Sequence, residues 1–585
     1  MTPIVGQAAQ VKGFGGMAGQ AGSAASLSRM LEAMAEMKAA SLGGIIDQTV
    51  AALQKDDFET GGRLAIQALE MDERSGFAWY LLAIARERAG DFPSSVRAYD
   101  KALQLIPAHA EVANDMGRLA YRMGMTETAE KLFAHYVAAH PENPEGINNL
   151  ACAVRDQGRY EEAVEVLRPA IVANPQAAVL WNTLGSVLAE QGDPAGCITF
   201  FDEALRLQPE FPKARYNRST ARLALADVEG ALEDCNAAMT APMPADEVQM
   251  MRLARSTMHL NLGDLVSGWG DYEARRDPNF GDVTHYLVER PEWTPASGLA
   301  GKSLLVFGEQ GLGDELLFAN LLPDVIEALG PEGRLTLSVE PRLVPLFQRS
   351  FPQARVGAHA TFAVDGRTVR VAAFLDEAEL AKIDLWAPLG SLLQGYRASA
   401  TAYPATGGYL TADPARVAHW REVLKGAPAG LKVGLLWKSM VAKGARHRWF
   451  SPFALWEPVL RTPGICLVNL QYGDCEAELA YAKAQGIDIW VPPGIDLKQD
   501  LDDVAALTCA LDLTVGFSNA SLNLAGACGA PVWMITPQAC WTQLGTDRYP
   551  WYPQTRVFTP SSYADWEEVM DQMAAALTVK TESGT

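Results

Sequence analysis

Apolar and polar positions follow two different patterns along this chain of 585 residues. Between residues 41 and 277, small and apolar residues return at helical spacing, and the whole pattern repeats. After residue 300, short β-rich apolar runs alternate with helical segments. The first pattern predicts repeated pairs of helices, and the second predicts a parallel sheet with helices on its faces. We therefore expect an α-helical array followed by an α/β region.

Glycine and proline mark the repeat with a constant step of 34 residues. The members of the two series are Gly90, Gly124, Gly158 and Gly192, and Pro107, Pro141, Pro175 and Pro209. Glycine suits the left-handed turn after a first helix, and proline cannot continue a second one. This step is the tetratricopeptide (TPR) spacing, and such repeats stack into a superhelix that binds other proteins. About six or seven repeats fit into residues 41–277.

Asparagines recur on the predicted first helices of the repeats. They are Asn114, Asn148, Asn149, Asn182 and Asn217. A regular ladder of amides on the inner face would hydrogen-bond an extended peptide from a protein acceptor. Hydrogen bonding between the helices themselves is the alternative explanation, and both remain open at this stage.

Composition shifts divide the chain into five parts. Residues 1–40 form a flexible tail with a short helix at 27–40, and residues 41–277 are the repeats. The proline-rich segment 278–300 is expected to be a linker. The α/β pattern then runs over 301–410 and restarts in 411–585, which predicts two lobes around a cleft. Within these lobes, strands are predicted at 303–307, 334–339, 355–356, 432–437, 465–470, 488–489, 513–515 and 531–535, with helices at 324–329, 343–351 and 566–579.

Charge and cysteine content exclude several classes of protein. The chain has 49 basic and 70 acidic residues, so its net charge of −21 argues against nucleic acid as a partner. No apolar stretch is long enough for a transmembrane helix, and the N-terminus lacks the basic region and apolar core expected of a secretory signal. Eight cysteines without a C-x-x-C pair favour a reduced, cytoplasmic protein, and no cluster of metal ligands is evident.

The first candidate site is the glycine-rich segment GEQGLGDE, residues 308–315, between a predicted strand and a helix. Gly311 and Gly313 would let a ligand approach the backbone at the helix N-terminus. Asp314, with Glu315 beside it, is the candidate general base. The alternative is that both acids only occupy a first helical turn, where acids are favoured.

The second candidate site is a cationic segment after the predicted strand 432–437. It contains Lys438, Lys443, Arg446, His447 and Arg448, and no acidic residue. Such a reversal of charge at the carboxyl end of a strand predicts binding of a phosphate or carboxylate. A solvated basic loop is the alternative.

Two further segments follow strands in the second lobe. Ser518, Asn519, Ser521 and Asn523 begin a helix, and they would either cap it or hydrogen-bond a phosphate. Gln471 and Tyr472 follow the strand at 465–470, where they would contact a nucleotide or form an ordinary turn.

These motifs together resemble a known family. The repeats, the segment RPEWTP, the motif GEQGLGDELLFANLLP and the motif ALDLTVGFSNASLNLAGACGAPVWMITP are similar to those of TPR-containing bacterial flagellin glycosyltransferases, whose catalytic half is heptosyltransferase-like. The resemblance implies a GT-B fold of two Rossmann-like lobes, with 301–410 on the acceptor side and 411–585 on the nucleotide-sugar side. It implies transfer of a nonulosonic acid of the pseudaminic or legionaminic type from a CMP-sugar to Ser/Thr of flagellin.

The resemblance also implies roles for individual residues. Asp314 matches the base of the family, and the segment from Lys438 to Arg448 matches the donor-phosphate loop. Ser518, Asn519 and Asn523 stand where the family usually has an acid, a hydroxyl residue and a histidine, which questions the usual nucleotide-diphosphate donor. Neither a metal nor a cofactor other than the nucleotide-sugar is implied. The alternatives are a UDP- or ADP-sugar transferase and a non-catalytic scaffold, and a flagellin chaperone is an alternative partner of the repeats.

Overall fold

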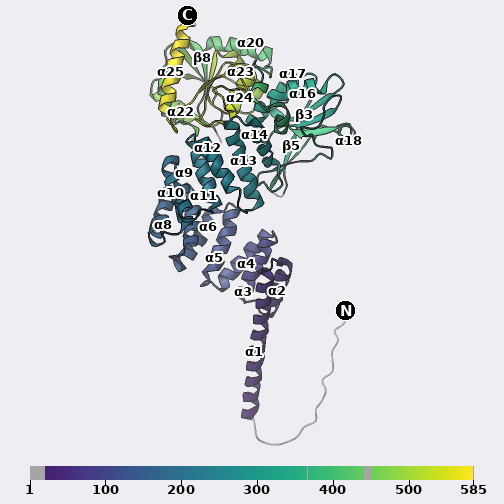
Figure 1. Cartoon of the computed structure of the whole chain (residues 1–585), viewed down its shortest axis with the longest axis vertical. Helices are drawn as coiled ribbons and strands as arrows, with labels where there is room; N and C mark the ends of the chain where they lie inside the picture. The colour runs from purple at the N-terminus through teal and green to yellow at the C-terminus, as the bar shows by residue number, and fades with distance from the viewer. Residues whose placement is uncertain (1–19, 365, 440–448, 584–585) are drawn as a thin grey trace. The chain divides into compact units, whose positions relative to one another are not determined.

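A computed structural model describes residues 20–364, 366–439 and 449–583 of the chain (Figure 1). The chain divides into two compact units, Met1–Pro175 and Gln176–Thr585. The described part of the first unit is helical, and the second contains further repeat helices followed by the α/β region. The described helices α1 to α14 form seven consecutive pairs.

The first unit begins with a helix that is longer than predicted. Helix α1 spans Gln20–Leu53, whereas the sequence predicts a flexible tail to residue 25 and a helix over 27–40 only. Alanine, methionine, glutamate and lysine favour the helix, and Ile45 fixes its end by packing with α2 and α3. The other helices of this unit are α2 (Phe58–Met71), α3 (Gly76–Arg88), α4 (Phe92–Leu105), α5 (Ala110–Arg122), α6 (Thr126–Ala139), α7 (Pro144–Arg155) and α8 (Tyr160–Ala173).

Backbone geometry confirms the predicted punctuation of the repeats. Gly90, Gly124, Gly158 and Gly192 have φ angles of 81°, 73°, 76° and 103°, in the left-handed region that favours glycine. An aspartate before the second helix of several repeats caps that helix, because its carboxylate accepts a backbone N–H three residues further on. These caps are Asp57, Asp91, Asp193, Asp227 and Asp264.

Small residues at the helix contacts allow the paired helices to approach closely. The repeat helices of the second unit are α9 (Ala178–Gln191), α10 (Pro194–Leu207), α11 (Pro212–Ala224), α12 (Val228–Ala238), α13 (Ala245–Asn261) and α14 (Leu265–Tyr272). On α9, a Cβ atom at Gly185 would lie 2.7 Å from the ring of Phe201 on α10. Gly117 has the same relationship to Phe133 in the first unit. Glycine is therefore required sterically at these two positions.

The α/β region begins with a four-stranded parallel sheet in the order β4-β3-β2-β7. Its strands are β2 (Ser303–Phe307), β3 (Arg334–Val339), β4 (Arg355–Ala358) and β7 (Leu385–Pro388). The helices around it are α15 (Leu312–Phe318), α16 (Leu322–Leu329), α17 (Val344–Ser350), α18 (Glu377–Leu380) and α19 (Leu393–Tyr396). The predicted strands at 303–307 and 334–339 are confirmed residue for residue, whereas β7 was not predicted.

A small second sheet corrects the prediction of a linker over 278–300. Strand β1 (Thr284–Tyr286) pairs in parallel with β6 (Arg367–Val371), which pairs with β5 (Ala360–Val364) in antiparallel orientation. Trp293 is buried, and its backbone N–H donates to the carbonyl of Trp386 on β7. The segment therefore belongs to the α/β region. A three-residue strand with its partner more than 80 residues away leaves no local periodicity to detect.

The last sheet has six parallel strands in the order β10-β9-β8-β11-β12-β13. This is the 3-2-1-4-5-6 order of doubly wound folds, whose ligands bind at the switch point, here between β8 and β11. Its strands are β8 (Leu431–Leu436), β9 (Ile465–Asn469), β10 (Ile489–Trp490), β11 (Leu513–Phe517), β12 (Val532–Ile535) and β13 (Arg556–Phe558). Its helices are α20 (Pro414–Val423), α21 (Glu457–Leu460), α22 (Glu476–Ala484), α23 (Leu501–Ala510), α24 (Ala520–Ala527) and α25 (Trp566–Ser583).

The repeats of the second unit share a hydrophobic core with the α/β region. Leu260, Leu265 and Trp269 of the last helix pair are buried in the same cluster as Phe318 on α15 and Trp551. The ring of Trp269 lies against both Phe318 and Trp551, with centroid separations of 6.2 Å. The predicted boundary at residue 277 therefore lies inside a continuous core.

Candidate active site

A cavity of about 690 Å³ lies where the carboxyl ends of the two larger parallel sheets face each other. Its walls come from the segments that follow β2 and β3 in the first sheet and β8, β9, β10, β11 and β12 in the second. Its polar lining residues include Asp314, Arg342, Tyr472, Lys498, Asn519 and Asn523. The cavity thus opens on the switch point of the second sheet, which is where α/β folds bind ligands.

The glycine-rich segment brings Asp314 to this cavity. Strand β2 ends at Phe307, the chain crosses Gly308–Gly311 as a loop, and α15 begins at Leu312. Gly311, Gly313 and Asp314 all line the cavity. The Asp314 carboxylate also lies close to Gly311, because a Cβ atom at Gly311 would be 2.9 Å from its Oδ2.

Glu315, predicted to assist Asp314, points away from the cavity. Its side chain is 1% exposed, and its Oε1 accepts the backbone N–H of Glu340 at 2.9 Å. Burial raises the pKa of Glu315 to about 8. The Glu315 carboxyl group therefore joins the start of α15 to the end of β3 by a hydrogen bond. We assign it no contact with a ligand.

Lys438 and Gln471, both predicted donor contacts, do not line the cavity. The Lys438 ammonium pairs with Glu478 on α22. The side-chain amide oxygen Oε1 of Gln471 accepts hydrogen bonds from the backbone N–H groups of Trp437 and Lys438, at 3.1 and 3.0 Å. Gln471 thus ties the ends of β8 and β9 together, whereas Tyr472 beside it does line the cavity.

The remaining cationic candidates, Lys443, Arg446, His447 and Arg448, lie outside the described residues. The segments that flank them on both sides are part of the cavity wall. Ser439 precedes them, and Trp449 and Phe450 follow them.

The segment after β11, called the late motif here, contributes Ser518, Asn519, Ser521 and Asn523 to the lining of the cavity. Asn519 caps α24, because its Oδ1 accepts the backbone N–H of Leu522 at 2.9 Å. Its Nδ2 is buried without a hydrogen-bond partner among the described residues, as is Oδ1 of Asn523, whose side chain is 6% exposed. Buried polar groups are normally hydrogen-bonded, so these two atoms and the N-terminus of α24 favour a polar ligand.

Two cations at the cavity were not predicted from the sequence. Arg342 follows β3, and its guanidinium donates to the carboxylate of Glu340 at 2.8 Å and to the carbonyl of Lys498 at 2.8 Å. Lys498 follows β10 and forms no ion pair with the described residues. Both positions lie beyond the carboxyl end of a strand, so the rule that located the other candidates also applies to them.

The asparagines of the repeats bond to one another within each unit. Asn149 donates to Asn114 at 3.3 Å and Asn148 donates to Asn149 at 3.2 Å in the first unit. Asn217 donates to Asn182 at 2.9 Å in the second. The Asn149–Asn114 and Asn217–Asn182 bonds join different helices, whereas Asn148 and Asn149 are neighbours on α7. These bonds occupy part of the amide capacity, and peptide binding by these residues stays a prediction.

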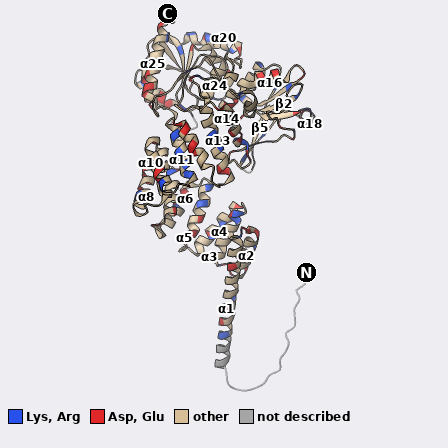
Figure 2. Cartoon of the chain, viewed as in Figure 1, with Lys and Arg blue, Asp and Glu red and all other residues tan. Residues whose placement is uncertain are grey.

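Figure 2 colours the ribbon blue at the lysines and arginines of α11 and α13, and several of these residues have acidic partners. Arg218 pairs with Asp202 and Asp234, at 2.6 and 2.5 Å. Arg255 pairs with Asp271 at 2.6 Å. Neutralisation by neighbouring helices means that these arginines do not form a net basic surface.

The described residues offer neither a metal-binding cluster nor a membrane-spanning helix. That part of the chain contains no group of three or more His, Cys, Asp or Glu side chains suited to a metal ion. Nor does any helix in it combine the length and hydropathy that crossing a bilayer requires.

Comparison with known proteins shows one relative over nearly the whole chain. The chain is 52% identical over 553 residues to Protein FlbA of Caulobacter vibrioides, which covers 94% of this chain and 92% of that protein. The tetratricopeptide repeat model matches residues 47–110, 114–178, 148–210 and 182–245. Tetratricopeptide repeat protein 7B of Homo sapiens is 31% identical over 112 residues, which is 19% of this chain and 13% of that protein.

Two solved structures are similar to part of this chain. MamA 41-end from Desulfovibrio magneticus RS-1 is 19% identical, with a TM-score of 0.27, and covers 29% of this chain and 95% of that chain. YrrB, a TPR protein, is 20% identical, with a TM-score of 0.25, and covers 30% of this chain and 91% of that chain. The tetratricopeptide identity of the helical repeats is therefore supported by the family model and by the spacing.

Proposed function

This chain belongs to the family of Protein FlbA, and we propose that it is a protein O-glycosyltransferase of the GT-B type. The sheet around β2 forms the acceptor half, and the sheet from β8 to β13 forms the nucleotide-sugar half. The donor is a CMP-linked nonulosonic acid of the pseudaminic or legionaminic type. The acceptor is a serine or threonine of flagellin, which the repeats bind.

One observation carries this proposal: Asp314 and the N-terminus of α24 reach the same cavity from the two facing sheets. A transferase needs a base for the acceptor hydroxyl and donors for the leaving phosphate, held on opposite sides of the reacting carbon. Asp314 is the only carboxylate among the described lining residues. Asn519 Nδ2 and the backbone N–H groups at the start of α24 are the matching hydrogen-bond donors.

The reaction follows from this arrangement. The acceptor hydroxyl oxygen forms a bond to the anomeric carbon of the sugar, and the bond from that carbon to the phosphate oxygen breaks. The electron pair of the broken bond leaves with CMP, and the hydroxyl proton passes to Asp314. Charge that develops on the leaving phosphate is stabilised by the N-terminus of α24.

The charges at the cavity favour an anionic donor. Arg342 and Lys498 are the two described cations in its wall, and one comes from each of the facing sheets. A CMP-nonulosonic acid carries two anions, one phosphate and one sugar carboxylate. Lys498 offers them an exposed ammonium in place of the predicted contact from Lys438, whereas Arg342 is already paired with Glu340.

Transfer is tested with purified protein, CMP-sugar and flagellin, with the mass of flagellin as the readout. Asp314→Asn should lower the rate by about 10²- to 10⁴-fold, because it removes the base. Glu332→Gln is the matched control, since Glu332 is an exposed carboxylate before β3, at the opposite edge of the sheet. Full activity of the Asp314→Asn variant would show that Asp314 is not the base. If the mass of flagellin does not increase with any nucleotide-sugar, the chain is better explained as a non-catalytic scaffold.

Donor class is tested separately through the melting temperature of the protein with CMP, UDP or ADP. Preferential stabilisation by CMP is expected. Stabilisation by UDP or ADP alone would replace the CMP-sugar with the corresponding nucleotide-diphosphate sugar, while leaving the reaction class intact.

A further inference from the structure

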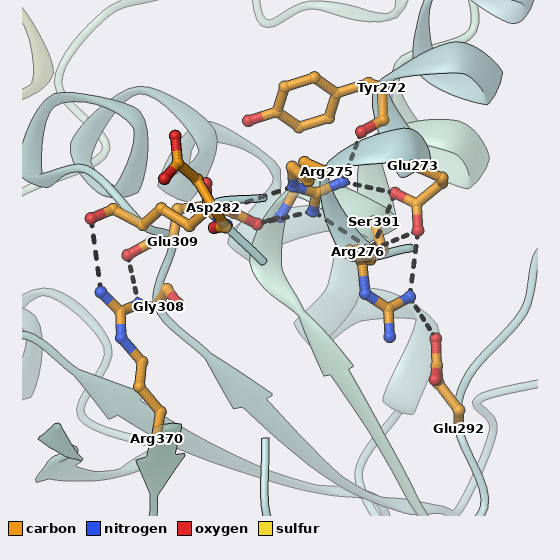
Figure 3. Close-up of polar contacts among 12 residues, drawn as sticks. Tyr272, Glu273, Arg275, Arg276, Asp282, Glu292, Gly308, Glu309, Arg370 and Ser391 are labelled. Carbon is orange, nitrogen blue, oxygen red and sulfur yellow. Dashed lines mark hydrogen bonds and ion pairs between the residues drawn. The ribbon is translucent and has the colours of Figure 1, made fainter. Parts of the chain in front are cut away.

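A buried ion pair joins the end of the repeats to the glycine-rich loop (Figure 3). Arg275 lies in the 3₁₀ turn η1 (Glu273–Arg276), directly after the last repeat helix α14. Its Nη2 donates to Oε1 of Glu309 at 2.9 Å, and its Nε donates to Oε2 at 3.3 Å. Glu309 is the second residue of the loop that leads to Asp314. Both side chains are at least 97% buried, so water does not screen this pair.

The remaining donors of Arg275 are also used. Nη1 donates to the carbonyl of Tyr272 at 3.2 Å and to the carboxylate of Glu273 at 2.7 Å. Its guanidinium carbon lies 4.1 Å from the ring centroid of Tyr272. Tyr272 and Glu273 thus fix the orientation of the Arg275 guanidinium, which forms a bidentate pair with Glu309.

The Glu309 carboxylate has a second partner, Gly390, which packs closely against it. Its Oε1 accepts the backbone N–H of Gly390 at 2.6 Å. A Cβ atom at Gly390 would lie 2.7 Å from that oxygen and 2.9 Å from Nη2 of Arg275. The Glu309 carboxylate is therefore enclosed by two segments, η1 after the last repeat helix and the segment that follows β7.

Arg370 on β6 holds the same loop by its backbone. Its Nη1 donates to the carbonyls of Gly308, at 2.8 Å, and Glu309, and its Nη2 donates to the carbonyl of Gln310 at 3.4 Å. Fixing three successive planar peptide units fixes the direction in which the chain enters α15. Only three residues separate Gln310 from Asp314.

We infer that Arg275 is a positioning residue: the end of the repeat array supplies the side chain that sets the glycine-rich loop and the place of Asp314 in the cavity. A buried ion pair is often replaceable by apolar residues without loss of stability, so stability alone does not account for it. An aromatic contact of α14 reinforces the link, since Tyr272 packs against Phe318 on α15, with a centroid separation of 5.8 Å. The functional part of this inference rests on the proposed role of Asp314.

The test uses the full chain with both charges removed together. In Arg275→Met/Glu309→Gln no buried charge is left unpaired, so the chain should fold. Arg275→Lys keeps the charge but loses the bidentate geometry. Arg276→Met is the matched control, because Arg276 lies in the same turn and pairs with Glu273 and Glu292 instead of the loop.

Two readouts are required, and one of them does not depend on activity. Amide hydrogen exchange of residues 308–318 should accelerate in the double variant by about tenfold or more, and the control should match the wild type. The kcat for transfer should fall by about 10²-fold with little change in donor KM, and Arg275→Lys should recover part of it.

The outcomes separate the two proposals. Unchanged exchange of 308–318 in the double variant, or kcat equal to that of Arg276→Met, would overturn the positioning role. A wild-type chain without transfer activity would refute the proposed function, while the exchange result would still decide whether Arg275 sets the loop.

Discussion

The indole N–H of Trp269, on the last repeat helix, donates to the backbone carbonyl of Arg397 at 2.9 Å. These residues are 128 positions apart, and both are almost fully buried. Arg397 in turn bonds Asn320 and Asp324 beside α15 and α16. The last repeat is thereby built into the sheet region that carries the candidate base.

Loss of the Trp269 ring should destabilise the second unit. Trp269→Ala is expected to cost about 3–5 kcal/mol in the free energy of unfolding, because it leaves a cavity among aromatic rings. Trp269→Phe should cost less, since it retains most of the ring but loses the hydrogen bond. Denaturant unfolding followed by fluorescence or circular dichroism measures both, and equal losses would show that the ring volume is unimportant.

Truncation at the two available boundaries should give opposite results. A chain that begins at residue 278 lacks Leu260, Leu265 and Trp269, and exposes the apolar core they cover, so it should aggregate. A chain that begins at residue 176 retains the whole second compact unit and should stay monodisperse. Size-exclusion chromatography distinguishes the two, and a well-folded 278–585 fragment would contradict the shared core.

The pH dependence of stability should carry a signature of Glu315. Burial raises its pKa from 4.5 to about 8, so between these values the folded chain holds a proton that the unfolded chain has lost. Raising the pH from about 5 to about 8 should therefore lower the free energy of unfolding, by on the order of 1 kcal/mol per pH unit from this group.

Glu315→Gln should remove that part of the slope. Glutamine keeps the acceptor for the N–H of Glu340 but cannot ionise. Thermal melts of the wild type, of Glu315→Gln and of the exposed control Glu332→Gln across this pH range measure the difference. Parallel pH profiles for all three proteins would show that Glu315 titrates normally.

Asn523 should be more important for binding than for stability. Because its buried Oδ1 has no partner among the described residues, Asn523→Leu should change the free energy of unfolding by less than about 1 kcal/mol. Loss of the hydrogen bond that this Oδ1 would accept from a hydroxyl or amine of the nucleotide should weaken nucleotide binding by up to about tenfold. Titration calorimetry and a thermal melt on the same sample test both parts, and unchanged affinity would place the nucleotide elsewhere.

Lys498 should contribute an electrostatic, salt-sensitive part of donor affinity. Lys498→Ala is expected to weaken CMP-sugar binding by several-fold at low salt and less at high salt, because the side chain is exposed and screened. Lys425→Ala is the control, since Lys425 is an exposed lysine before β8 that pairs with Glu422. Equal affinities for the two variants at low salt would exclude Lys498 from the donor site.

The features of the fold that were predicted correctly depend on residues that are close together in the sequence. The left-handed glycines, the strands β2 and β3, and the position of Asp314 after a glycine-rich loop all depend on residues close together in sequence. Other elements depend on distant partners. Strand β1 forms only because β6 lies beside it, and its three residues show no periodicity of their own.

Candidate residues divide in the same way. Ser518, Asn519, Ser521 and Asn523 reach the cavity because a helix N-terminus after a parallel strand always lies at that edge of the sheet. Lys438 was predicted from the same rule, but Glu478 on another helix neutralises it. The sequence shows a charge at a strand end, and only the packing shows whether an opposite charge already accompanies it.

The sequence by itself determined the two architectures, the order of the repeats and sheets, and the strand ends that hold Asp314 and the late motif, because periodicity and turn chemistry are local properties. Only the tertiary structure decided that the last repeat is part of the sheet region's core and that Arg275 grips Glu309. The reason is physical: a buried charge must be paired, and its partner can come from any part of the chain that folding brings within hydrogen-bond distance.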